Sequence, residues 1–120
     1  MRTATMDIQA SINKLREIED KKDELITKVE SFFNKRKEEG KEELPVERAQ
    51  LQNLLRLALS TSSVKEIQLF IRYQIGRHKQ WRTGDFGQTL ENVIREIGRI
   101  EFVRLFLGYL VREARFRKPD

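Results

Sequence analysis

The sequence contains no cysteine, only two prolines and only six glycines among its 120 residues. Without cysteine the chain can form neither a disulfide framework nor a thiolate metal site, and a reducing cytosol suits it. Glu, Lys, Arg, Leu, Ile and Gln are abundant instead, and these residues favour helices. We therefore expect an all-α protein.

Long hydrophobic runs are also missing. Nothing approaches the roughly 18 consecutive apolar residues of a membrane-spanning helix. The N-terminal stretch MRTATMDIQASINKLREIED lacks the apolar segment of a signal peptide. These absences predict a cytoplasmic protein without a membrane partner. The composition, 38% hydrophobic and 36% charged, is that of a folded chain with one modest core.

Apolar residues at helical spacing predict a single domain, 1–120, that forms a bundle of about five helices. The longest periodic segment, 7–37, predicts a helix of about 30 residues, roughly 45 Å long, within a long N-terminal helical unit at 1–39. We expect one end of this helix to project and to pack on a neighbour. A charged, exposed connector at 40–45 follows, in which Gly40 stops one helix and Pro45 suits the first turn of the next.

An Arg-rich helical core is expected over 46–120. The pattern predicts its helices at 46–59, 64–80, 86–97 and 100–116, with a turn at 81–85 and a frayed tail from residue 115. Ser63 with Glu66 and Asp85 with Gln88 match the capping box that begins a helix. Gly98 is a candidate C-cap.

Candidate catalytic groups are sparse. His78 is the only histidine, so it has no partner for a metal pair or for a Ser-His-Asp triad. The stretches RTGD and GDFG lack the lysine and the preceding strand of a phosphate-binding loop. We expect the acidic residues of the connector to be solvated. The sequence therefore predicts a protein that is not an enzyme and that holds neither a metal nor a cofactor.

Positive charge is concentrated in the second part of the chain. Residues 1–47 carry 10 Lys and Arg against 12 Asp and Glu, whereas residues 48–120 carry 14 against 7. Eleven of those 14 are arginines. The planar guanidinium of arginine suits phosphate oxygens. An Arg-rich half with few opposing acids favours a polyanionic partner, although a solubilising basic face is the alternative.

The basic residues fall at regular helical positions. Lys65, Arg72 and Lys79 recur every seven residues, a spacing that drifts by only about 20° per step and so forms one stripe. In the closing helix Arg104, Arg112 and Arg115 lie within an arc of about 80°. Five further basic residues complete the candidate nucleic-acid-binding set: Arg56 within the helix at 46–59, Arg77 and Arg82 where the helix at 64–80 ends, and Arg117 and Lys118 beyond the closing helix.

The helix beginning Val64-Lys65-Glu66 offers no short polar side chains for reading bases, so we expect contact with the backbone of the nucleic acid. Tyr73, Trp81 and Tyr109 are candidates for base stacking, with core packing as their alternative.

Three stretches give the chain a resemblance to a known family. They are AQLQNLLRLA at 49–58, LFIRYQIGR at 69–77 and EFVRLFLGYLVREARFRKPD at 101–120. In this order they resemble the small subunit of the type III-A (Csm) CRISPR–Cas effector complex. The chain departs from that family at Leu107 and Gly108, and the acidic connector has no counterpart in it. FGQTL at 86–90 is similar to a segment of the type III-B (Cmr) small subunit, so the III-B complex is an alternative.

The resemblance implies a non-catalytic helical subunit of a complex in antiviral defence. Its partners would be guide (crRNA) and target single-stranded RNA, other CRISPR effector subunits, and copies of itself stacked in the complex, with weak self-association of the free protein. The family's motif positions correspond to Arg77, Arg112, Arg115 and, in the leading helix, Arg56. Two other classes remain open: a helical protein–protein adaptor, in which the first helix docks a partner, and a DNA-binding regulator.

Overall fold

Five long helices and two short helical turns make up the described part of the chain. The computed structural model describes the backbone of residues 2–119 and the side chains of residues 7–119. Along that range the elements are α1 (Arg2–Glu38), α2 (Arg48–Ser60), α3 (Val64–Arg77), α4 (Lys79–Arg82), the 3-10 turn η1 (Thr83–Asp85), α5 (Phe86–Ile97) and α6 (Ile100–Arg117). The prediction of an all-α bundle with a long N-terminal helix is confirmed. Residues 1 and 120 of the predicted domain lie outside the described range.

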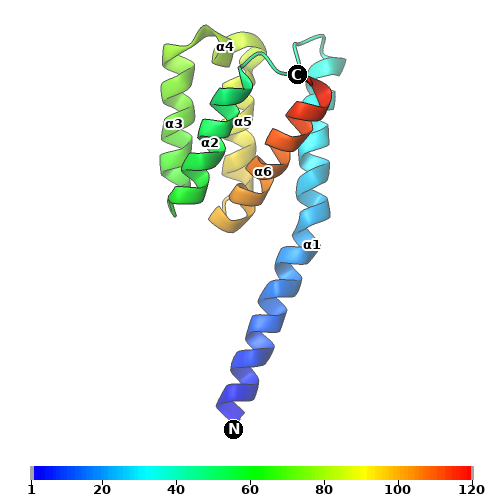
Figure 1. The fold of residues 1–120 in the computed structure, drawn as a ribbon, viewed down its shortest axis with the longest axis vertical. Coiled ribbons are helices and arrows are strands. Elements are labelled where there is room, and N and C mark those ends of the chain that lie inside the picture. Colours follow the sequence, from blue (N-terminus) through cyan, green and yellow to red (C-terminus); the bar gives the residue numbers. More distant parts are fainter. Residues whose placement is uncertain (1, 120) are drawn as a thin grey trace.

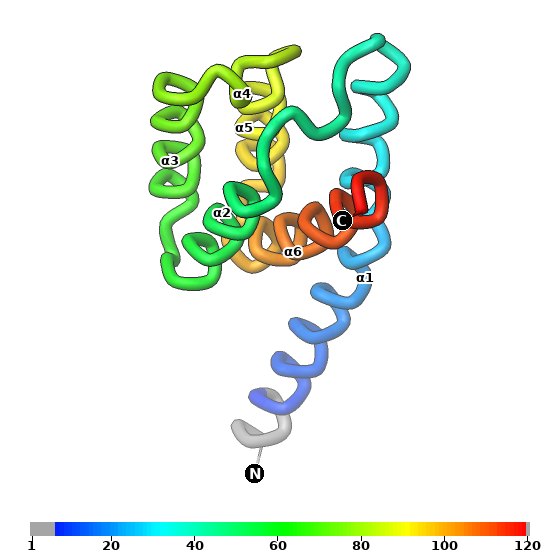
Figure 2. Tube along the Cα trace, turned by 45° about the horizontal axis from the view of Figure 1, so that its top comes forward, coloured from blue at the N-terminus to red at the C-terminus, as the bar shows by residue number. Residues whose placement is uncertain are grey.

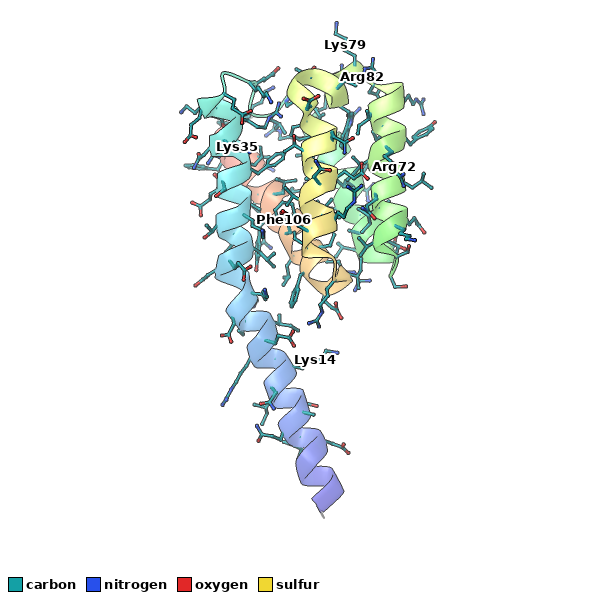
Figure 3. The ribbon with its side chains drawn as sticks, turned by 180° about the vertical axis from the view of Figure 1, so that it is seen from behind. Lys14, Lys35, Arg72, Lys79, Arg82 and Phe106 are labelled. Carbon is teal, nitrogen blue, oxygen red and sulfur yellow. The ribbon has the colours of Figure 1, made fainter. Side chains whose placement is uncertain are left out.

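The helices of the bundle form two layers. α2 packs against α6 on the side that faces the viewer in Figure 1, and α3 packs against α5 on the side seen in Figure 3. The upper half of α1 lies along α6, so the first helix contacts the last (Figure 1). The core between these elements includes Leu54, Ile71, Phe86, Ile94 and Phe106, all fully buried.

α1 extends well beyond the bundle, as predicted from its length. The molecule measures 58 × 26 × 25 Å, and the long dimension follows α1 (Figure 1). Ile8 and Leu15 are 61% and 63% exposed, whereas Leu25 and Val29 are buried against the bundle. Arg99, just before α6, forms an ion pair with Glu17 of α1. The projecting half therefore presents apolar side chains to solvent, and the expected neighbour that would cover them stays a prediction.

The connector between α1 and α2 is less exposed than expected. Gly40 ends α1 with a φ of 73°, as its sequence position predicts. Leu44 and Val46, however, are buried, and α2 begins only at Arg48, so Pro45 precedes the helix instead of starting it. Figure 2 shows the connector running from the end of α1 across to α2. Its two apolar side chains contribute to the core on the way.

The helix predicted at 64–80 ends three residues early, at Arg77. His78 is extended, with φ −123° and ψ 121°, and α4 then begins a new direction. After this break Trp81 is completely buried, with its ring at 5.8 Å from that of Phe86. Packing of one large side chain thus overrides a local preference to continue the helix.

The predicted helix ends have mixed outcomes. The Ser63 hydroxyl accepts a hydrogen bond from the backbone N–H of Glu66, and Gly98 ends α5 with a φ of 74°. These two predictions are confirmed. The predicted cap at Asp85 is wrong, because that residue is left-handed (φ 57°) and its side chain makes no cap hydrogen bond. Fraying from residue 115 is also contradicted, since α6 continues to Arg117.

Replacing Gly87 with alanine is expected to lower the free energy of unfolding by about 1–3 kcal/mol through overpacking. Gly87 lies where α5 crosses α3, and an added Cβ would lie 2.5 Å from Ile75 Cγ1 and 3.0 Å from the Trp81 carbonyl oxygen. Urea unfolding followed by circular dichroism measures the change. Gly108→Ala in α6 is the matched control, because its Cβ would meet nothing within 4 Å. It should add about 0.5–1 kcal/mol. Equal stabilities of the two variants would contradict the close α3–α5 contact.

Candidate nucleic-acid interface

A buried carboxylate joins two arginines between α3 and α5. Arg95 Nη2 lies 2.8 Å from Glu91 Oε1, and Arg72 Nε lies 3.8 Å from the same oxygen. The Glu91 side chain is 2% exposed, whereas those of Arg72 and Arg95 are 59% and 61% exposed. Arg72 was predicted from sequence and Arg95 was missed. The i,i+4 spacing of Glu91 and Arg95 is the sequence signal that could have found it.

Three more predicted basic residues gather where α3 ends. Arg77, Lys79 and Arg82 are all exposed, and Figure 3 shows Lys79 and Arg82 at the end of the molecule above Arg72. Arg77 donates to the Tyr73 hydroxyl at 3.1 Å, and Arg82 donates to the Ile75 carbonyl at 2.7 Å. These contacts hold the two guanidiniums without neutralising them. The break at His78 moves Lys79 onto α4, so the predicted stripe of Lys65, Arg72 and Lys79 is not a single helix face.

Of the other exposed basic residues in the predicted set, Lys65 lies in the first turn of α3, and the rest belong to the α2–α6 layer. Arg115 shares a hollow of about 200 Å³ with Arg48 between α2 and α6. Arg112 lines a separate hollow of about 260 Å³ between α1 and α6, together with Glu30 of α1. Arg56 bonds to Asn53, and Lys118 is exposed beyond the end of α6. The predicted set is therefore divided between the two layers, and the α3–α5 side with α4 carries the denser group.

Two of the predicted residues are engaged inside the fold. Arg104 donates to the carbonyls of Ala58 and Thr61, at 2.8 and 2.6 Å, and so closes the C-terminal end of α2. Arg117 is 16% exposed and bonds Glu113 and Glu43. Burial lowers the pKa of Arg117, but hydrogen bonds to those two carboxylates outweigh it and raise the pKa above its usual value. Neither residue therefore belongs to the candidate surface.

One structural arginine was not singled out from sequence. Arg36 is 3% exposed and donates to the carbonyls of Glu42, Thr83 and Gly84 at 2.9, 3.2 and 2.9 Å. Its guanidinium also lies 5.1 Å from the Phe86 ring centre. Burial lowers the pKa of Arg36 from its ordinary value. This side chain ties the end of α1 to the connector and to η1.

Of the three aromatic candidates for stacking, Trp81 is excluded because it is completely buried. Tyr73 is 57% exposed and carries Arg77 at 5.8 Å from its ring centre. Tyr109 is half-buried, with Arg112 at 5.9 Å from its ring centre. Tyr73 thus offers an open aromatic face beside the basic group at the end of α3.

A hollow of about 700 Å³ lies between α1 and α5. Phe32 and Val93 contribute apolar surface, and three lysines, one arginine and three glutamates also line it. Lys28 pairs with Glu96 at 3.9 Å, and Lys41 pairs with Glu39 at 2.9 Å. Because three glutamates line it beside the lysines, and Arg36 is engaged with backbone carbonyls, this hollow is a poor site for an anion.

Within residues 2–119 no three His, Cys, Asp or Glu side chains come together as metal ligands. Nor does that range include a helix with the length and apolar character needed to cross a bilayer. Comparison of the chain with known protein families, with curated proteins and with solved structures finds no match.

Proposed function

We propose that the chain is a non-catalytic small subunit of a type III CRISPR–Cas effector complex, of the III-A (Csm) kind, and that it binds the backbone of guide and target RNA. The observation that supports this most strongly is the group of exposed cations on the α3–α5 side and α4: Arg72, Arg77, Lys79, Arg82 and Arg95. Only one carboxylate, that of Glu91, pairs with members of this group in the described structure. The choice of this particular complex rests on the sequence resemblance, and the III-B (Cmr) small subunit is the alternative.

Binding through phosphates gives a defined salt dependence. If four to six phosphates are contacted, log K should fall against log salt concentration with a slope of roughly −3 to −4, from about −0.7 per phosphate of a single strand. Fluorescence anisotropy with two unrelated single-stranded RNAs measures it. The two slopes should agree, because backbone contacts carry no sequence information.

Charge reversal locates the surface. We expect Arg77→Glu with Lys79→Glu to weaken RNA binding at least about tenfold and to reduce the salt slope, since both cations lie on the proposed face. The control reverses Lys14 and Arg16 on the projecting half of α1, which gives the same change in net charge far from that face; Lys14 is labelled in Figure 3. An equal loss in both variants would contradict a localised interface.

A protein–protein adaptor is the second candidate, and a specific observation favours it. Ile8, Ile12 and Leu15 form an exposed apolar stripe on the projecting half of α1. A helix of this kind can dock in a partner's apolar groove. An adaptor would show no tight binding to bare RNA at low salt. A DNA-binding regulator would instead prefer one duplex sequence over single-stranded RNA.

A further inference from the structure

Glu91 is a carboxylate buried on an otherwise apolar face of α5. It lies on the face of α5 that meets α3, one turn beyond Gly87, and its neighbours on the inward side of α5 are apolar: Phe86, Leu90 and Ile94. A buried charge is costly unless it is paired, and an apolar residue of similar size commonly stabilises a fold as well or better. The presence of a carboxylate here therefore calls for a role beyond stability.

The guanidiniums of Arg72 and Arg95 each contact Glu91 on one side and solvent on the other. Arg72 from α3 and Arg95 from α5 reach the same atom, Oε1, through one nitrogen each. No other hydrogen bond or ion pair engages either guanidinium among the described residues. Because both side chains are more than half exposed, their remaining N–H groups face solvent.

The charge of this cluster suits an anion. One arginine would neutralise Glu91, so the second leaves the trio with a net positive charge. A guanidinium carries five N–H donors in a planar fork that fits the oxygens of a phosphate. A fixed carboxylate that hydrogen-bonds one fork and lies 3.8 Å from the other restricts both side chains and so reduces the entropy that would be lost on binding.

We propose that Arg72 and Arg95, oriented by Glu91, clamp a phosphodiester group of single-stranded RNA, and that Glu91 is a positioning residue for this pair. The inference rests on the proposed function and names a phosphate contact between α3 and α5. Lys79 and Arg82, above Arg72 in Figure 3, extend the path of the strand toward the end of the molecule.

Glu91→Gln gives the decisive test because two effects have opposite signs. Removing a negative charge should tighten binding to a polyanion if Glu91 acts only through its charge. If Glu91 orients the arginines, its loss should instead weaken binding about five- to tenfold, the equivalent of about one charge-assisted hydrogen bond. The probe is an unstructured single-stranded RNA, with affinity measured across a salt series. Glu96→Gln, on the same helix but paired with Lys28, is the control and should not weaken binding.

Arg72→Gln and Arg95→Gln keep the conclusion testable if Glu91→Gln is poorly folded, since both side chains lie at the surface. Each should weaken binding about tenfold and reduce the salt slope by about 0.7. In the double variant Arg72→Gln with Glu91→Gln, the loss of RNA-binding free energy should be smaller than the sum of the two single losses. This is expected because Glu91 acts through the arginine. Thermal unfolding by circular dichroism verifies that each variant is folded.

The outcomes separate this inference from the proposed function. Wild-type protein that binds no RNA at low salt would overturn both. Wild-type binding combined with tighter binding by Glu91→Gln, or with unchanged binding by Arg72→Gln and Arg95→Gln, would overturn the clamp and leave RNA binding in place.

Discussion

Replacing Arg36 with methionine is expected to lower the free energy of unfolding by about 3–5 kcal/mol. The guanidinium donates to three carbonyls, those of Glu42, Thr83 and Gly84, which belong to two separate parts of the chain. Methionine fills similar space but donates no hydrogen bond, so these acceptors lose a charged donor in a place that water reaches poorly. Urea unfolding followed by circular dichroism measures the loss.

Lys37→Met is the matched control for Arg36→Met. It removes the same charge from the next residue of α1, where the side chain is exposed, and should change stability by no more than about 0.5 kcal/mol. Arg36→Lys should recover only part of the loss, because one ammonium cannot reach all three carbonyls in the geometry of a planar fork. Similar stabilities of Arg36→Met and Lys37→Met would contradict the bridging role of Arg36.

Trp81→Ala is expected to destabilise the protein by about 3–5 kcal/mol, the usual range for emptying a large aromatic site in a core. Trp81 is completely buried, packs edge-to-face on Phe86, and donates from Nε1 to Gln50 Oε1 at 2.5 Å. The alanine variant loses the packing and also leaves the Gln50 oxygen without its donor. Circular dichroism during urea unfolding gives the measurement, since Trp81 is the only tryptophan.

Trp81→Phe separates packing from hydrogen bonding. Phenylalanine keeps an aromatic contact with Phe86 but cannot donate to Gln50, so we expect a smaller loss than for alanine. If alanine and phenylalanine at this position give the same stability, the α4 turn does not anchor the core as described.

The sequence predicts the start of a helix well where its apolar residues recur steadily along one face. α5 and α6 begin at the expected residues because their apolar positions recur steadily along one side. The end of α3 at Arg77 was not predictable in this way. Its cause is the burial of Trp81 against Gln50, a residue 31 positions away, and helical periodicity carries no information about such a contact.

The same limit applies to the candidate interface. Arg72, Arg77, Lys79 and Arg82 were selected by type and spacing, and the structure leaves them exposed. Arg104 and Arg117 are also arginines at exposed-looking positions of the closing helix. Arg104, however, donates to carbonyls more than 40 residues away, and Arg117 donates to a glutamate 74 residues away. Whether an arginine serves the fold or a ligand depends on these distant partners. Glu91 was not selected at all, because its burial follows from the packing of α5 on α3.

The contact between the first and the last helix bears on how the chain matures in the cell. α1 is translated before α6, and the surface on which Val29 and Phe33 rest is completed only when α6 has been made. Until then these side chains face water or whatever apolar surface is near, a condition that promotes association between nascent chains. Closure of the core therefore waits for the synthesis of α6, the last of these helices to be translated.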